Sequence, residues 1–395
     1  MYSKHILTGI RWVVGLLFVF SGLVKANDPL GLSYKMQEFF EAWGWPLSFN
    51  HYTLSLSVLM NAFEIIAGIA LLIGWRMRLL SWSLLALTVF FTFLTGYASL
   101  ATNPDGSMKF RSCGCFGDCL PLNPVQSFLK DLVLLALILL LLVYRNKIKQ
   151  SFSSVVTNSL VMIAAVVFSF GLQWYTLKYL PVVDCLPFKK GNDLLQLRQI
   201  PANAVPDSFD IKFIYSKGGV DKEFNVTALP DSTWTFKERK QVLVRKGINN
   251  EPLIKDLNLK SISGADLTEG ILGQNGTHYL LFIQSAENLK KDDEWIQALQ
   301  RILDKNGKVS ILTAVPDEIE KLLRDKSVLY DIPLPGSDPE RPAEVQLMPL
   351  SGSLEIYSCD VTVIKTASRA IPVLYRMNGS VVEEKWSGAS ISSWK

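Results

Sequence analysis

The long apolar runs of this chain all lie before about residue 180, near 7–25, 55–75, 79–100, 126–144 and 154–176. Each run has about 18 or more residues, the length that an α-helix needs to cross a bilayer. Beyond these runs, apolar and polar positions alternate as they do in a domain exposed to water. The pattern therefore predicts an α-helical membrane bundle followed by a domain outside the bilayer.

The loops between the apolar runs differ in charge. The connections on one side are short and basic, whereas 26–54 and 101–125 are longer and contain acidic residues. The basic residues of the first side are Lys4, Arg76, Arg78, Arg145, Lys147 and Lys149. Because basic loops stay in the cytoplasm, we expect a multi-pass protein of the bacterial inner membrane with a cytoplasmic N-terminus and a periplasmic C-terminal domain. The first run lacks a small-residue cleavage site, so we expect a retained helix.

This orientation places all five cysteines outside the cytoplasm, where disulfides form. Three of them lie in the stretch SCGCFGDC, residues 112–119, ahead of the fourth apolar run. A disulfide between Cys113 and Cys115 closes a very small ring, so it is strained and readily exchanged. The alternatives are a reactive dithiol and a plain disulfide between Cys119 and one member of the pair. A metal site lacks a fourth ligand and a nearby histidine.

The other two cysteines lie far from this stretch in the sequence. Cys185 follows the fifth apolar run and either reaches Cys113, Cys115 or Cys119 in a mixed disulfide or remains a solitary half-cystine. We expect Cys359 to be a lone buried thiol. The N-terminus of the fourth membrane helix is expected to lower the pKa of a nearby thiol through its dipole.

Glu64 is an ionisable residue early in the second apolar run. Such a residue usually faces the interior of a bundle. A functional interpretation makes Glu64 part of a quinone or proton site. The structural alternative pairs Glu64 with Lys25 or Lys130 near the outer interface.

Residues 12–145 resemble the DoxX/MauE-type family of four-helix membrane proteins. The resemblance rests on FSGLVKANDP at 20–29, EIIAG at 64–68 and CGCFGD at 113–118. It implies a four-helix core and thiol–disulfide or quinone-linked redox chemistry in the envelope. Ser112 stands where many relatives have an acidic residue, and Cys119 is an additional thiol.

The second half of the chain resembles a thioredoxin fold preceded by a β-rich connector. The connector contains a hairpin signal at Lys217-Gly218-Gly219. The expected thioredoxin-like order includes an opening hairpin over 253–267 and a cis-proline at Pro372, with a Pro-rich surface insertion over 333–342. Residues 284–288 (QSAEN) replace the usual Cys-x-x-Cys, so this domain has no thiolate at that helix N-terminus.

A surface of this domain is the candidate partner site. A cis-proline loop presents backbone groups to an extended peptide, so we expect binding between Pro372 and Ser285, Ala286 and Glu287. The structural alternative keeps the cis bond for its shape alone. The expected domains are a four-helix membrane domain (1–150), a fifth transmembrane helix (151–181), the connector (182–249) and the degenerate thioredoxin-like domain (250–395).

These observations predict a membrane-bound thiol–disulfide redox relay of the bacterial envelope. Cys113 and Cys115 would cycle between dithiol and disulfide, and Cys119 or Cys185 would resolve a mixed disulfide with an envelope protein that has exchangeable thiols. Quinone is the candidate cofactor near Glu64. The alternative is a non-catalytic envelope scaffold or assembly factor that uses the outer domain as a binding module. The net charge of +4 has no basic stripe, so membrane lipid is expected as a partner and nucleic acid is not.

Overall fold

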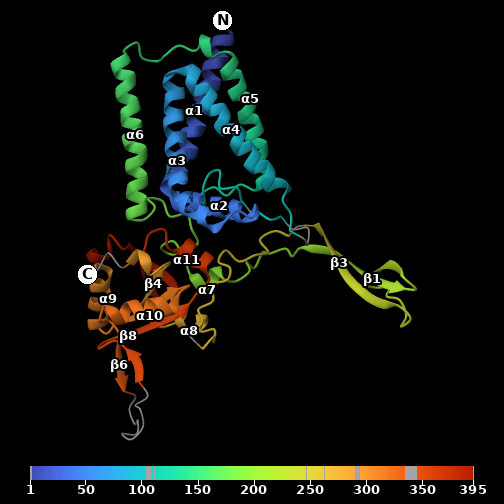
Figure 1. Cartoon of the computed structure of the whole chain (residues 1–395), viewed down its shortest axis with the longest axis vertical. Coiled ribbons are helices and arrows are strands. Elements are labelled where there is room, and N and C mark those ends of the chain that lie inside the picture. Colours follow the sequence, from blue (N-terminus) through green and yellow to red (C-terminus); the bar gives the residue numbers. More distant parts are fainter. Residues whose placement is uncertain are drawn as a thin grey trace.

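A computed structural model describes residues 2–103, 108–110, 112–245, 247–261, 263–289, 294–333 and 345–394. Its N-terminal part has five helices long and apolar enough to cross a membrane, as the hydropathy pattern predicts. They are α1 (Tyr2–Asn27), α3 (Asn50–Ile73), α4 (Met77–Leu100), α5 (Pro124–Val143) and α6 (Val155–Lys178). Figure 1 shows these helices side by side, with a β-rich region beyond one end of the bundle.

Glycines allow α1 and α3 to pack closely. A Cβ atom added at Gly22 would lie 2.7 Å from Cγ1 of Ile65, and one added at Gly68 would lie 2.8 Å from the carbonyl oxygen of Gly15. Small residues at such crossings let helix backbones approach. The polar ends of α1 and α3 are therefore held against each other, which positions Lys25 and Glu64.

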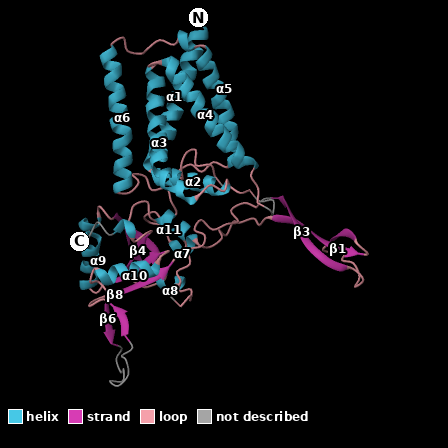
Figure 2. Ribbon diagram, in the orientation of Figure 1, coloured by secondary structure: helices cyan, strands magenta, loops and turns pink. Residues whose placement is uncertain are grey.

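The loop expected over 26–54 contains a further helix, α2 (Pro29–Ala42). Asp28 is its N-cap and accepts a hydrogen bond from the backbone N–H of Gly31, and Pro29 occupies the first turn, where its missing N–H is no disadvantage. Figure 2 shows α2 lying across the end of the bundle. Leu32, Met36 and Phe39 are its buried apolar side chains. The sequence analysis missed this helix because its apolar stripe is short and interrupted by charged residues.

A three-stranded antiparallel sheet projects as an arm from the rest of the chain (Figure 1). Its strands, in the order β2-β1-β3, are β1 (Ser208–Lys217), β2 (Val220–Asn225) and β3 (Thr235–Arg245). Gly218 and Gly219 adopt φ values of 61° and 82° between β1 and β2, a conformation that favours glycine. The hairpin predicted here is confirmed.

The outer domain contains a five-stranded sheet in the order β10-β9-β4-β5-β8. The pairs β4–β5 and β5–β8 are parallel, and β4–β9 and β9–β10 are antiparallel. Its strands are β4 (Thr277–Ile283), β5 (Lys308–Thr313), β8 (Ser353–Ser358), β9 (Val373–Asn378) and β10 (Val381–Ser387); β6 (Tyr330–Pro333) and β7 (Val345–Met348) form a separate pair.

Helices cover both faces of the five-stranded sheet. One apolar core joins it to α9 (Glu294–Asp304) and α10 (Pro316–Asp325). A second core joins it to α7 (Leu194–Leu197), α8 (Thr268–Leu272) and α11 (Val361–Ala367). The short 3-10 helices are η1 (Leu47–Phe49), η2 (Arg145–Lys147), η3 (Glu287–Leu289) and η4 (Ile391–Ser393). The domain is thus a layered α/β structure in which α7, from the connector, also takes part.

Two local predictions have different outcomes. The peptide bond Ile371–Pro372 is cis, as predicted. The opening hairpin expected over 253–267 is wrong, because Lys260 makes only isolated bridges with Asp266 and Ser358, while the nearby apolar side chains turn into the core. Most of the Pro-rich insertion expected over 333–342 lies outside the described residues.

Candidate functional site

The cysteine loop, residues 112–119, lies between α4 and α5 and leads into the N-terminus of α5. Asn123 caps α5 by a reciprocal capping box with Gln126, so the helix start predicted from Asn123-Pro124 is confirmed. Gly114 and Gly117 have positive φ values of 68° and 56°, which let the chain turn within the loop. These turns place the thiols of the loop beside the outer ends of the membrane helices.

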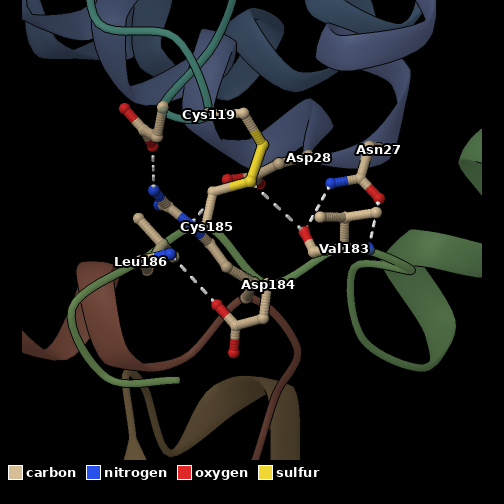
Figure 3. The surroundings of a disulfide bond; sticks show 9 residues. Asn27, Asp28, Cys119, Val183, Asp184, Cys185 and Leu186 are labelled. Carbon is tan, nitrogen blue, oxygen red and sulfur yellow. Dashed lines mark hydrogen bonds and ion pairs between the residues drawn. A yellow bond between two sulfur atoms is a disulfide. The ribbon is translucent and has the colours of Figure 1, made fainter. Parts of the chain in front are cut away.

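A disulfide joins Cys119 to Cys185, as Figure 3 shows. The Cα atoms lie 4.9 Å apart, within the usual range for a disulfide. It links the cysteine loop to the segment that follows α6. This pairing corrects two sequence-based alternatives: Cys119 does not bond Cys113 or Cys115, and Cys185 is not solitary. Neither alternative took account of how close α6 brings Cys185 to the loop.

Cys113 and Cys115 are free thiols. Burial raises the pKa of Cys113 to about 12, reinforced by the nearby Cys115, while the Ser127 hydroxyl and the Lys35 ammonium act in the opposite direction. Burial also raises the pKa of Cys115, against the opposing charge of Lys130. The expected lowering of a thiol pKa by the α5 N-terminus is wrong, because desolvation disfavours the thiolate more strongly.

A cavity of about 240 Å³ lies among α1, α3, α4, α5 and the cysteine loop. Its polar end contains the following lining residues: Ser21, Lys25, Glu64, Cys115, Lys130 and Asp131. The remaining wall is mainly apolar and consists of Leu17, Phe18, Thr88, Phe91, Phe116, Val133, Leu134 and Leu137. The cavity thus places one cysteine of the free pair beside buried charged groups and apolar rings.

The charges at the polar end of the cavity are paired. Glu64 forms an ion pair with Lys25, and both side chains are only 3 % exposed. The hydroxyl of Ser21 lies 2.9 Å from Oε2 of Glu64 and 3.1 Å from the carbonyl oxygen of Cys115. Lys130 lies 2.7 Å from Oδ1 of Asp131. Glu64 therefore has the Lys25 partner of the structural alternative and also lines a cavity that reaches a free thiol.

The mouth of the cavity lies between α1 and α5. Leu17 on α1 and Val133 on α5 line it and are also exposed on the surface of the bundle, Val133 to 63 %. In a membrane-spanning bundle, such apolar side chains contact lipid. A lipophilic molecule can therefore reach the cavity from the bilayer.

The candidate partner residues of the outer domain lie apart from this cavity. Ala286 and Pro372 are buried, Ser285 is half-buried and Glu287 is exposed. Ala286 belongs to the core cluster against which Ile371 packs. Only part of the expected partner surface is therefore accessible.

Sequence reasoning missed the polar residues through which the outer domain contacts the membrane domain. Arg369 lies close to Asp28 and Asp118, and the hydroxyl of Tyr34 lies 3.1 Å from Nε2 of Gln284. Asp28 and Asp118 occur within the resembling motifs, but nothing in the sequence pairs them with Arg369. Cys359 is a free, buried thiol, and burial raises its pKa to about 12. The described residues contain no cluster of metal-ligating side chains.

Comparison with known families identifies two segments. Residues 3–144 match the model of the family described as methylamine utilisation protein MauE. Residues 209–246, which are the projecting arm, match a domain of unknown function, DUF8463. No curated protein and no solved structure matches the chain.

Proposed function

Since residues 3–144 form a MauE-family membrane domain, we propose that this protein is an envelope thiol–disulfide redox relay linked to a membrane quinone. The observation that carries the proposal is the shared cavity. Cys115 lines the same apolar, bilayer-facing space as Lys25, Glu64 and Lys130. A thiol that can exchange electrons and a lipophilic acceptor would meet there.

The residues present fit a quinone ring. The walls offer the aromatic side chains of Phe91 and Phe116, and the polar end offers the hydroxyl of Ser21 and the ammonium groups of Lys25 and Lys130. Ligand sites commonly combine apolar walls with a few polar groups that fix orientation. When bound, a quinone supplies an acceptor for two electrons and two protons.

The chemical work of the protein falls to the free pair. The thiols of Cys113 and Cys115 lose two electrons and two protons and form one S–S bond. Because their pKa values are raised, a thiolate must be generated locally, and the Lys130 ammonium favours that form of Cys115. The Glu64 carboxylate, held by Lys25 and Ser21, is the candidate proton acceptor at the cavity.

We assign Cys119 and Cys185 to exchange with an envelope protein. A partner dithiol reduces the Cys119–Cys185 disulfide and is oxidised in return. The Cys119 thiolate then attacks the Cys113–Cys115 disulfide, and Cys185 displaces it, which restores Cys119–Cys185 and leaves the inner pair reduced. Electrons and protons balance at each step. The proposed location is the inner membrane with this side in the periplasm.

The outer domain is proposed to be thioredoxin-like but without its dithiol. The strand order β10-β9-β4-β5-β8 and the cis bond before Pro372 support this fold. Gln284 follows β4 where a redox cysteine would stand. The domain would therefore bind or position other parts of the relay rather than exchange electrons.

Burial of both inner thiols supports a second function, a non-catalytic scaffold. Cys113 is 8 % exposed, and raised pKa values make both thiols unreactive at neutral pH. In a scaffold, these cysteines would act as small apolar side chains, and the outer domain would bind a partner through exposed residues such as Glu287.

Oxidation by quinone separates the two functions. Full-length protein in proteoliposomes is treated with a short-chain ubiquinone, alkylated and mapped by mass spectrometry. A relay forms the Cys113–Cys115 disulfide, loses this reaction in Cys115→Ser and keeps it in Cys359→Ser, whose thiol lies in the outer core. The relay is wrong if both inner thiols remain free under excess quinone while the protein is folded.

A further inference from the structure

One arginine of the outer domain reaches into the membrane domain. Arg369 is 6 % exposed. Its Nε lies 2.9 Å from Oδ2 of Asp28, and its Nη2 lies 2.7 Å from Oδ2 of Asp118. Its Nη1 donates a hydrogen bond to the carbonyl oxygen of Lys365. The planar guanidinium can direct separate N–H groups at two carboxylates, so one side chain joins three segments of the chain.

The two carboxylates come from separate parts of the membrane domain. Asp28 caps α2, and Asp118 lies in the cysteine loop directly before the disulfide-bonded Cys119. A Cβ atom at Gly31 would lie 2.9 Å from Oδ2 of Asp28 and 3.2 Å from Oδ2 of Asp118. Glycine at this position therefore leaves room for both carboxylates to converge on Arg369.

Further contacts surround the guanidinium. The Tyr34 ring lies 5.3 Å from the Arg369 guanidinium carbon. Gln284 donates from Nε2 to the Ser368 carbonyl oxygen and lies 2.9 Å from the Ser368 hydroxyl. Lys365 donates to Oε1 of Gln37 on α2. The segment before the cis bond and the residue after β4 thus face the membrane domain of their own chain.

We infer that the outer domain holds the cysteine loop of its own chain, with Arg369 as a positioning residue for the Cys113/Cys115 dithiol. Asp118 lies between the inner pair and Cys119, so its ion pair fixes the part of the loop across which electrons would pass. This role rests on the proposed function for its consequence in turnover. The contact itself also predicts that the loop shields the inner thiols.

Removing the guanidinium leaves two carboxylates facing each other without a cation. A buried carboxylate without its partner is strongly unfavourable, so the loop should open at Asp118 while the disulfide keeps Cys119 in place. Lysine restores the positive charge but cannot address both carboxylates in the same fork geometry. Arg369→Lys should therefore rescue the loop only in part.

The test measures alkylation of Cys113 and Cys115 by a membrane-impermeant maleimide in full-length protein in membranes, without reductant. Arg369→Gln should raise the rate by about tenfold or more, because loss of a buried ion pair lowers the free energy of local opening. Arg369→Lys should give an intermediate rate. The control is Arg376→Gln, which removes a half-exposed ion pair with Glu383 inside the outer domain and should leave the rate unchanged.

Cys359 reports unfolding of the outer domain, since its thiol is buried there. If Cys359 also becomes reactive in Arg369→Gln, Asp118→Asn decides, because it removes the loop's side of the ion pair and leaves the outer domain intact. Unchanged inner-thiol rates in Asp118→Asn, or in a folded Arg369→Gln, overturn the inference. The readout needs no turnover, so failure of quinone oxidation in the unaltered protein would refute the relay without affecting this result.

Discussion

Removing one partner of the Lys25–Glu64 ion pair should destabilise the membrane domain severely. The two side chains are 3 % and 2 % exposed and belong to α1 and α3. The variants are Lys25→Met, Glu64→Gln and the double variant Lys25→Met/Glu64→Leu. Each single variant leaves one buried charge without its counterion, whereas the double variant leaves neither.

The expected size follows from what each remaining charge keeps. Breaking a buried pair costs about 3–5 kcal/mol. Glu64 keeps the Ser21 hydroxyl, and Lys25 keeps the Phe91 ring at 4.9 Å from its Nζ, so the lower end applies. A loss of about 3 kcal/mol lowers the folding equilibrium constant about 100-fold. The double variant should lose only about 1 kcal/mol, since apolar replacement of a buried pair is often nearly neutral.

The assay is denaturant unfolding of the purified full-length protein in detergent, followed by helix content and by oxidation with quinone. Lys237→Ala is the control, because it removes an exposed ion pair with Asp221 on the arm and should cost less than about 1 kcal/mol. Single-variant losses that simply add in the double variant would refute the reasoning. A folded double variant that has lost quinone oxidation would assign Glu64 to the reaction, and one that keeps it would make the pair structural.

Three further predictions concern packing, pH and orientation. Gly22→Ala should cost about 1–3 kcal/mol through overpacking against α3, because the added carbon would lie 2.7 Å from a side chain, whereas Gly9→Ala meets nothing within 4 Å; unfolding of both variants compares them. The pKa of Cys113 is raised to about 12, so its alkylation rate should rise about tenfold per pH unit from pH 7 to 9, and a plateau in that range would contradict the raised value. A reporter fused after Lys149 should be cytoplasmic and one after Lys190 extracytoplasmic, and finding both on one side would contradict the orientation.

The fold was predictable where one local pattern determines the element. Long apolar runs predict the membrane helices, and the glycine pair after Lys217 predicts the turn of the arm. Helix α2 escaped prediction because Lys35, Glu38 and Glu41 interrupt its apolar stripe. The expected hairpin over 253–267 failed because local turn signals do not show whether a second strand is available to pair.

The site was predictable in its residues but not in their pairing. The cysteine spacing drew attention to Cys113 and Cys115, yet the bond between Cys119 and Cys185 spans 66 residues and depends on the return of α6. The pKa shifts had the opposite sign to the expected dipole effect because burial of the loop is a tertiary property. Arg369 carried no signal at all, since an arginine becomes informative only when Asp28 and Asp118 are seen to converge on it.

Burial of the inner pair restricts how molecules can reach it. Cys113 is nearly inaccessible from the aqueous side, and Cys115 lines a cavity whose mouth lies between apolar side chains of α1 and α5. A protein partner is too large to enter that mouth, but it can approach the Cys119–Cys185 disulfide, whose sulfur atoms belong to half-buried residues. Under the proposed relay, the two disulfide-forming pairs therefore serve different phases: the inner pair serves the bilayer, and the outer pair serves the envelope. The loop joining them must keep a fixed geometry for exchange between the pairs, and this requirement explains why the outer domain would hold it through Arg369.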